Sequence, residues 1–437
     1  GADVVVTGRV TDASLVLGPA AAHHGWTPGE YDALAGAVVA GHVIECGTQA
    51  CGGNFSGFAT MPRDARPLGF PIAEIAADGS SVITKHDGTG GVVTVDTVTA
   101  QLVYEIQSAR YLNPDVTTDL SSIALTQAGP DRVAVTGVTG APPPEQLKVC
   151  VNELGGWRNS MEFLLTGLAI EEKTAWVKEQ LTAAWGERAP ATLAWARTAG
   201  PQPNPESQEL ASCVLRCTAL DPDPIVAGKG FTAPAVEIAL ASYPGFTLTA
   251  PPAPASPYGI YRAKYVDRSV LEHTVTHDDG TREVIADPGE YLPAEELAAV
   301  VDAGRRPSPY DAPGDTVNRQ LPLGTFVHAR SGDKGGDANL GLWVSREDVD
   351  GPDGQKYQAR VTWLTKLITP AKVRELVPEA ADLEVDVYTL PNLGAVNVVI
   401  RGLLGEGVAA GTRTDPQAKA LGEWVRARHV HIQGELL

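Results

Sequence analysis

Short apolar runs alternate with longer amphipathic stretches over the first 107 residues. The runs VVV at 4–6 and VI at 43–44 are typical of strands buried on both faces. Thr27, Pro28 and Glu30 form the capping signal that opens a helix. The pattern predicts a turn at 8–14 leading into a helix broken near Pro19, strands at 3–7, 43–44, 71–75 and 81–85, and helices at 27–41 and 96–107. Such alternation favours an α/β domain with a mostly parallel sheet and functional loops at the strand ends.

The character of the chain changes after about residue 121. Apolar–polar alternation around Gly129-Pro130-Asp131 predicts a hairpin. The same patterns predict strands at 148–152, 160–166, 191–197 and 212–220, a helix at 171–185 and another from Pro234. This is α+β material, either a second lobe or a continuation of the first domain. Proline-rich stretches at 251–257 and 286–322 have the composition of connectors.

The last part of the chain has the pattern of a small separate domain. It predicts strands at 324–330, 339–345, 383–389 and 396–401, and helices at 357–377 and 415–428. Two helices on one face of four strands form an α+β sandwich. We therefore expect a first domain at 1–320, which includes a connector at about 286–320, and a second domain at 321–437.

The amino-acid composition indicates which kinds of molecule this chain can bind. The chain has 34 Lys and Arg against 53 Asp and Glu, a formal charge of -19, which disfavours nucleic acid and anionic membranes. An anionic small molecule can still bind a local basic pocket. Five cysteines in 437 residues make no disulfide framework, and Cys213 and Cys217 share the face of a strand with Leu215. No run approaches the roughly 20 apolar residues that span a bilayer. We expect a cytoplasmic, homo-oligomeric protein.

Two loops near the N-terminus carry the first candidate chemistry. In GRVTDAS (8–14), Arg9 can grip a carboxylate or phosphate and Asp12 can act as a base, or the two form a structural pair beside a helix cap. In IECGTQACGGNFSG (44–57), Glu45 is a candidate general base, Cys46 a candidate nucleophile and Asn54 a ligand contact. The alternatives are a structural glycine turn or a zinc site from His42, Cys46 and Cys51, but the spacing lacks a paired metal motif. We predict no metal.

Three further loops combine glycine with charged or amide side chains. In TKHDGTGG (84–91) an anion could be held by Lys85, His86, Gly88, Gly90 and Gly91, although neither nucleotide-binding glycine motif is present. The loops NELGGWRNS (152–160) and ARSGDKGGDANLG (329–341) supply further candidates for binding the substrate or a subunit: Arg158, Asn159, Ser331, Asp333 and Lys334, with Asp337 beside them. The alternative for each loop is an ordinary folded turn.

Several long motifs together resemble one known family. GADVVVTGRVTDASLVLGP, GHVIECGTQACGGNF, FPIAEIAADGSSVITKHDGTGG and RYLNPDV, in this order, are similar to the acyclic terpene utilisation (AtuA-like) proteins. LPLGTFVHARSGDKGGDANLG resembles the ferredoxin-like domain that follows in that family. The resemblance implies an N-terminal segment ahead of residue 1, and it implies threonine where this chain has Cys51.

The resemblance also implies a metabolic setting, the bacterial degradation of citronellol- and geraniol-type compounds as CoA thioesters. We expect an enzyme that acts on a branched acyl-CoA or related carboxylate by lyase, hydratase or hydrolase chemistry. CoA would enter as part of the substrate, and no other cofactor is indicated. The alternative is a non-catalytic binding or scaffolding subunit of an acyl-CoA-processing complex. A thiol enzyme that uses Cys46 is a third hypothesis.

Overall fold

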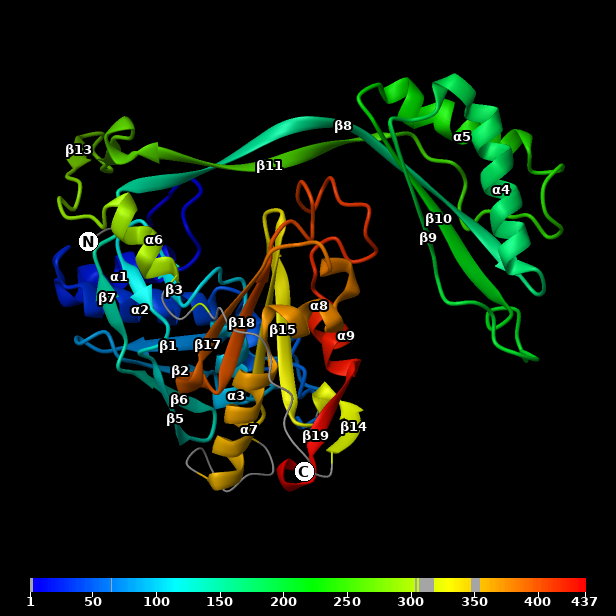
Figure 1. Ribbon diagram of the computed structural model, residues 1–437. Coiled ribbons are helices and arrows are strands. Elements are labelled where there is room, and N and C mark those ends of the chain that lie inside the picture. The colour runs from blue at the N-terminus through cyan, green and yellow to red at the C-terminus, as the bar shows by residue number, and fades with distance from the viewer. Residues whose placement is uncertain (1–2, 64, 303–304, 306–317, 347–353) are drawn as a thin grey trace. The chain divides into compact units, whose positions relative to one another are not determined.

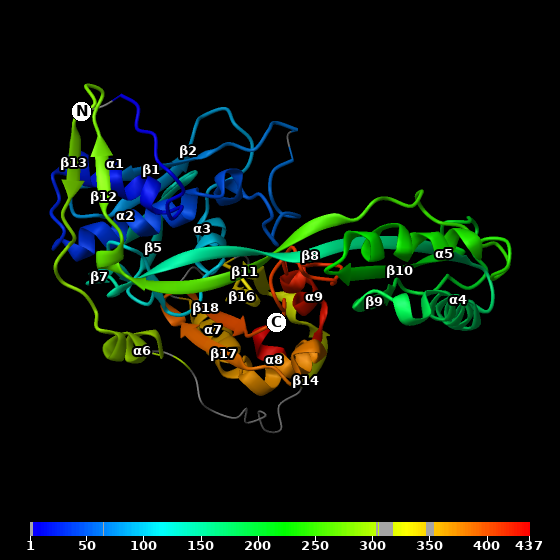
Figure 2. The same cartoon turned by 90° about the horizontal axis from the view of Figure 1, so that it is seen from above.

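The computed structural model describes residues 3–63, 65–302, 305, 318–346 and 354–437. The chain forms two compact units, each with a hydrophobic core of its own (Figures 1 and 2). The first unit takes in the chain to Val149, Ala263–Leu404 and Gln417–Leu437. The second unit comprises Cys150–Arg262 and Gly405–Pro416.

Helix α2 is the centre of the N-terminal part of the first unit. Its eleven residues from Ala33 to Val43 are all buried, and a helix that is apolar on every side needs neighbours all round. The prediction of a strand at 43–44 was wrong, because this apolar segment is the last turn of α2. The elements of this part are α1 (Ser14–His24), α2 (Tyr31–Ile44), a 3-10 helix (Gly47–Cys51), β1 (Pro71–Ile75), β2 (Ser81–Lys85), α3 (Val95–Leu102), β3 (Arg110–Leu112), β4 (Thr117–Asp119), β5 (Ala124–Gly129), β6 (Arg132–Thr136) and β7 (Thr139–Ala141).

The two sheets of this part are antiparallel, so the prediction of a mostly parallel sheet was wrong. Their orders are β1-β2-β6-β5 and β3-β4-β7. The connection between β1 and β2 is only residues 76–80, whereas a parallel pair needs a crossover of a dozen or more residues. Gly79 has φ +82 and packs its Cα against Ala33 of α2, where a side chain would collide. The predicted strands at 71–75 and 81–85 and the hairpin around 129–131 are confirmed.

The apolar run at 4–6 does not form a strand. Val4, Val5 and Val6 are 78%, 76% and 91% exposed, and residues 3–7 contain no regular secondary structure. The prediction of a buried opening strand was therefore wrong: these β-branched residues pair with none of the described strands.

The C-terminal part of the first unit is a four-stranded antiparallel sheet in the order β15-β16-β18-β17. Its elements are β14 (Asn318–Pro322), β15 (Val327–Lys334), β16 (Asp337–Val344), α7 (Gln355–Leu367), α8 (Pro370–Leu376), β17 (Val385–Leu390), β18 (Ala395–Ile400), α9 (Leu421–Ala427) and β19 (His429–Gln433). One face packs against α7 and α8, and the other shares a core with Val98 and Leu102 of α3 (Figure 1). Burial on both faces explains why β18 is apolar at every position except Asn397. Pro370 splits the helix predicted at 357–377 into two.

The second unit is built on the sheet β11-β8-β10-β9. Its elements are β8 (Gln146–Thr166), which begins in the first unit, α4 (Ile170–Trp185), β9 (Thr192–Arg197), β10 (Ser212–Asp221), a short π-helix (Val226–Gly230), α5 (Phe231–Glu237) and β11 (Ser256–Asp267), which ends in the first unit. Cys213, Leu215 and Cys217 all point into its core, as the alternation in β10 predicted. The two strands predicted between 148 and 166 are one continuous strand, β8.

Two further strands and one α-helix belong to the first unit: β12 (His273–Thr276), β13 (Arg282–Ile285) and α6 (Ala294–Asp302). None of the helices in the described ranges combines the length and the apolar character needed to cross a bilayer.

Candidate functional site

Four segments of the first unit converge on Glu45. They are the end of α2, Tyr104 and Glu105 shortly after α3, the end of β15, and the turn before α9. Ion pairs, ring contacts and electrostatic coupling link their polar side chains, which we call the Glu45 cluster: Glu45, Cys46, Tyr104, Glu105, Arg330, Asp333, Lys334 and Lys419.

Glu45 is the C-cap of α2, and its N–H donates to Gly41 O at 3.0 Å. Its side chain is only 12% exposed, and Oε2 is buried without a hydrogen bond from the described residues. Burial raises the pKa of this carboxyl group to about 7, and the nearby charges of Asp12 and Glu105 add to the effect, while Lys334 opposes it. The negative end of the α2 dipole also disfavours a carboxylate here.

His42 lies one turn earlier on α2, with Nδ1 3.8 Å from Glu45 Oε1 and a ring that contacts Tyr111. Burial lowers the pKa of His42 to about 4, and Lys334 acts in the same direction. The contact with Glu45 is therefore one between two groups that burial drives toward their neutral forms, and it is not an ion pair at neutral pH. The neutral His42 side chain therefore shields Glu45 from solvent on one side but does not compensate the negative charge of Glu45.

Glu105 is held in an uncommon conformation on the other side of the cluster. Its φ is +54, a left-handed value that costs a residue with a Cβ on the order of 1 kcal/mol. Its N–H donates to Asn339 Oδ1 at 2.6 Å, and its carboxylate accepts from Lys419 Nζ at 2.9 Å. Burial opposes ionisation, but hydrogen bonds from Tyr104 and Lys419 outweigh it and keep the pKa of Glu105 below its ordinary value. The cluster thus contains one carboxyl group that favours the proton and one that favours the charge.

The hairpin of β15 and β16 carries Asp333 and Lys334 to this place. Glycines permit the close packing: a Cβ on Gly332 would stand 2.6 Å from the Tyr104 ring, and one on Gly341 would stand 2.5 Å from Val103 O. Asp333 lies 3.9 Å from Lys419, and burial raises the pKa of its carboxyl group. Lys334 has no ion pair within 4 Å in the described ranges, although its charge acts on both His42 and Glu45.

Cys46 Sγ lies 3.9 Å from Glu45 Oε1. Burial raises the pKa of the Cys46 thiol to about 11, and the charges of Glu45 and Glu105 contribute, against Arg330 and Lys419. A thiol with this pKa is almost wholly protonated at neutral pH, which disfavours the nucleophile hypothesis. Cys51 is buried with a pKa near 11 as well, for the same main reason.

The structure brings Asp12 near Glu45 but gives Arg9 no described partner. Both are exposed, and Ala13 is the N-cap of α1, without a capping side chain. Asn54 is at the surface with φ +54, and its carbonyl oxygen accepts from Arg330 at 2.8 Å. Asn54 therefore meets the cluster through its backbone.

The TKHDGTGG turn uses its polar groups internally. Lys85 Nζ is 3.2 Å from Asp131 Oδ2 and donates to Thr89 O at 3.1 Å. Gly90 donates its N–H to Pro67 O, Gly88 accepts from Arg66, and a Cβ on Gly91 would collide with Cys51 O. His86 is exposed. This geometry fits the folded-turn alternative better than an anion cradle.

The remaining predicted residues also have internal partners. Arg158 and Asn159 belong to the second unit, where Arg158 donates to Ala409 O at 2.7 Å and Asn159 to Ala253 O at 2.9 Å. Ser331 Oγ is buried and accepts from Gly422 N at 2.8 Å near the start of α9. Asp337 pairs with Arg401 at 2.9 Å.

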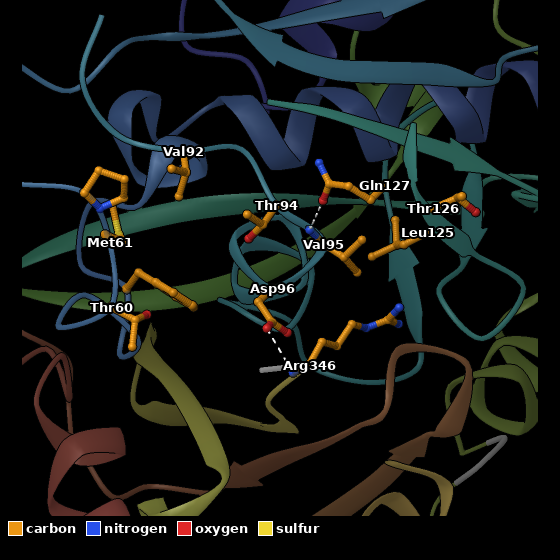
Figure 3. A pocket seen from close by; sticks show the side chains of 12 residues that line it. Thr60, Met61, Val92, Thr94, Val95, Asp96, Leu125, Thr126, Gln127 and Arg346 are labelled. Carbon is orange, nitrogen blue, oxygen red and sulfur yellow. Dashed lines mark hydrogen bonds between the residues drawn. The ribbon is translucent and has the colours of Figure 1, made fainter. Parts of the chain in front are cut away.

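A separate cavity of about 620 Å³ lies at the opposite end of α3. Phe55, Met61, Val95 and Leu125 give it a largely apolar lining (Figure 3). Two of its polar side chains accept backbone hydrogen bonds: Gln127 Oε1 accepts from Val95 N at 3.2 Å and Asp96 Oδ2 from Arg346 N at 3.0 Å, as the dashed lines of Figure 3 show. Around Glu45, by contrast, several acid and base groups with shifted pKa values lie together, among them His42, Glu105 and Asp333. We place the candidate site there.

Sequence reasoning missed five members of this environment: His42 as a neighbour of the carboxyl group, Tyr104, Glu105, Arg330 and Lys419. Arg330 stands inside the ARSGDKGG motif, so the density of that motif was a usable signal. Tyr104, Glu105 and Lys419 lie in segments without a motif, and only the tertiary fold brings them together. Among the described residues, no three His, Cys, Asp or Glu side chains are arranged to hold a metal ion.

Two protein-family models match the chain. The family model described as acyclic terpene utilisation family protein AtuA matches residues 1–277. The model described as AtuA ferredoxin-like domain matches residues 321–431. No curated protein and no solved structure matches the chain.

Proposed function

The chain belongs to the acyclic terpene utilisation family AtuA, and from this premise we propose that it is an enzyme of terpene catabolism in which Glu45 is the general acid and base. The substrate would be a branched acyl-CoA or a related carboxylate, with CoA present only as part of the substrate. The reaction would be of the lyase, hydratase or hydrolase type. All three move a proton while negative charge develops on a carbonyl oxygen.

The observation that carries the proposal is the environment of Glu45. A carboxyl group with a pKa near 7 is present in both protonation states at neutral pH, so it can remove a proton and return it. An ordinary surface glutamate would be a far weaker base. Two further observations support a role of Glu45 as acid and base. The buried His42 side chain excludes solvent from one side of Glu45, and Glu45 Oε2 has no hydrogen bond to any described residue.

Lys334 would stabilise the negative charge that develops on the substrate. It reaches the cluster from the β15–β16 hairpin, acts electrostatically on Glu45 and has no ion pair in the described ranges. A cation in a half-buried site stabilises an enolate or oxyanion more strongly than one in water. Asp12 and Glu105 would help to set the proton affinity of Glu45, and Cys46 would form part of the wall.

The formal net charge of -19 supports a small-molecule substrate rather than nucleic-acid or membrane partners. We also propose a cytoplasmic location and a homo-oligomer.

Deuterium exchange tests the proposed chemistry. Branched acyl-CoA thioesters are incubated with the protein in D₂O, and mass spectrometry follows deuterium at the carbons next to the thioester, with release of free CoA measured in parallel. We expect E45Q to reduce the faster of these reactions by about 10²-fold or more. The exposed E423Q is the matched control and should retain it. Equal rates for E45Q and the native protein would refute the role of Glu45. A protein that co-purifies with another subunit and turns over only in its presence would favour the scaffolding alternative.

A further inference from the structure

We propose that Arg330 binds a carboxylate group of the ligand in the Glu45 cluster. The inference rests on the proposed function, because it names the chemical group that the same site recognises.

Arg330 is a buried cation without a described anionic partner. The residue is only 8% exposed. Its guanidinium group donates to Asn54 O at 2.8 Å and to Gln49 Oε1, both neutral acceptors, and Nε has no hydrogen bond to any described residue. In the described ranges no carboxylate lies within 4 Å of it. Glu105, which favours its charge electrostatically, already pairs with Lys419.

An unpaired buried charge is costly, and proteins usually compensate it. Arg268 shows the compensated case in the same unit, since its buried guanidinium group lies 3.2 Å from Asp287 Oδ1. Arg330 lacks such a partner among the described residues, and burial lowers its pKa. A bound carboxylate would supply the missing negative charge and hydrogen-bond acceptors at once.

The surroundings of Arg330 hold it in one orientation. Its planar group stacks over the Tyr104 ring, with the guanidinium carbon 4.3 Å from the ring centre. The left-handed conformation of Asn54 and the 3-10 helix that carries Gln49 present the two neutral acceptors. A guanidinium group fixed in this way loses little freedom when it forms two parallel bonds to a planar carboxylate. The ECGTQACGGN loop therefore acts through the backbone and side chain that orient Arg330.

The position of Arg330 relates the bound carboxylate to the proposed chemistry. The positive charge of Arg330 acts to lower the pKa of Cys46, which follows Glu45 in the chain. The aromatic ring under its guanidinium group belongs to Tyr104, which precedes Glu105. A carboxylate on Arg330 would thus lie within the cluster that contains the acid–base group. This places the anchoring group and the proton-transfer group in one site.

Ligand-induced thermal stabilisation tests the assignment on the full chain. The probe is 3-methylbutanoate, a small branched carboxylate, with inorganic phosphate as a second anion. We expect millimolar 3-methylbutanoate to raise the melting temperature of the native protein, and R330M to abolish this rise. Without probe, R330M should melt within about 3 °C of the native protein or above it, because the substitution removes an uncompensated charge.

R426M is the matched control. Arg426 lies in the same unit and also donates to a backbone oxygen, Val327 O at 3.0 Å, but Glu423 compensates its charge at 2.8 Å. R426M should lower the melting temperature and keep the response to the probe, and R330K should retain a weaker response. Binding of 3-methylbutanoate by R330M as strong as by the native protein would overturn the assignment, as would a native response to phosphate alone. E45Q should still bind the probe, so loss of exchange in E45Q with binding retained separates the two proposals.

Discussion

At the scale of single residues, the raised pKa of Glu45 should affect the stability of the fold as well as its chemistry. The pKa of Glu45 is raised in the folded protein from about 4.5 to about 7. The folded state therefore binds the proton more tightly than the unfolded state. The stabilisation is complete below the unfolded pKa and is lost as the pH rises through the folded one.

E45Q imitates the protonated side chain and should reverse this loss. At about pH 8.5 we expect the variant to exceed the native protein in free energy of unfolding by on the order of 2 kcal/mol, and the gap should vanish near pH 4. Denaturant unfolding at several pH values measures it. E105Q provides a control of opposite sign, because the lowered pKa of Glu105 stabilises the fold above its unfolded pKa and this contribution disappears on acidification. A gap for E45Q that does not change with pH would contradict the account.

At the scale of elements, the packing of β16 on the segment after α3 positions half of the site. Gly341 is the point of closest approach, where a Cβ would meet Val103 Cγ2 at 2.4 Å and Val103 O at 2.5 Å. The backbone oxygen cannot rotate away as the end of a flexible side chain can. The hairpin that carries Lys334 therefore depends on this glycine.

Gly341→Ala should destabilise the protein by about 1–3 kcal/mol because it overpacks this contact. Gly129→Ala is the matched control, since a Cβ there meets nothing within 4 Å and its φ is not in the left-handed range. Thermal unfolding of both variants checks the prediction. Equal melting temperatures for the two variants would show that the contact between Gly341 and Val103 tolerates a Cβ.

The elements also show how far the sequence could lead. Strong local signals succeeded: β1 and β2 have the predicted bounds, and the turn residues at 129–131 located a hairpin. The direction of the strands was missed, because apolar composition reports burial and not the partner of a strand. Glu45 was selected as the end of a strand and is in fact the C-cap of α2, so the predicted element was wrong, while the role of Glu45 in a site stays a prediction.

The candidate site was only partly accessible to the same reasoning. Glu45, Asp333 and Lys334 lie in glycine-rich motifs that stand out along the chain. Tyr104, Glu105 and Lys419 join them through contacts between residues more than 300 positions apart, such as Lys419 with Glu105. Lys85 and Arg158 lie in similar motifs, but each has an internal partner, Asp131 for Lys85 and Ala409 O for Arg158.

At the scale of the whole molecule, the chain has two units with separate cores, and one of them contains the complete Glu45 cluster. Both family matches contribute to that unit, since the cluster draws residues from 45–105 and from 330–419. The ferredoxin-like domain is therefore part of the proposed site.

Separate cores should give two unfolding transitions in calorimetry. Leu340→Ala removes a buried side chain from the first unit and Leu181→Ala from the second, each at a cost of about 2–5 kcal/mol. We expect each variant to lower a different transition and to leave the other unchanged. One transition that both variants shift equally would show that the units unfold together.

Direct titration of Glu45 in the folded protein tests the central claim without any substrate. The chain is labelled with ¹³C at the glutamate side-chain carboxyl carbon, and the Glu45 resonance is assigned as the one that E45Q removes. We expect its midpoint at about pH 7, lower in E105Q and higher in K334M, because Glu105 raises the pKa of Glu45 and Lys334 lowers it. A midpoint at the ordinary glutamate value of about 4.5, unmoved by either substitution, would contradict the account.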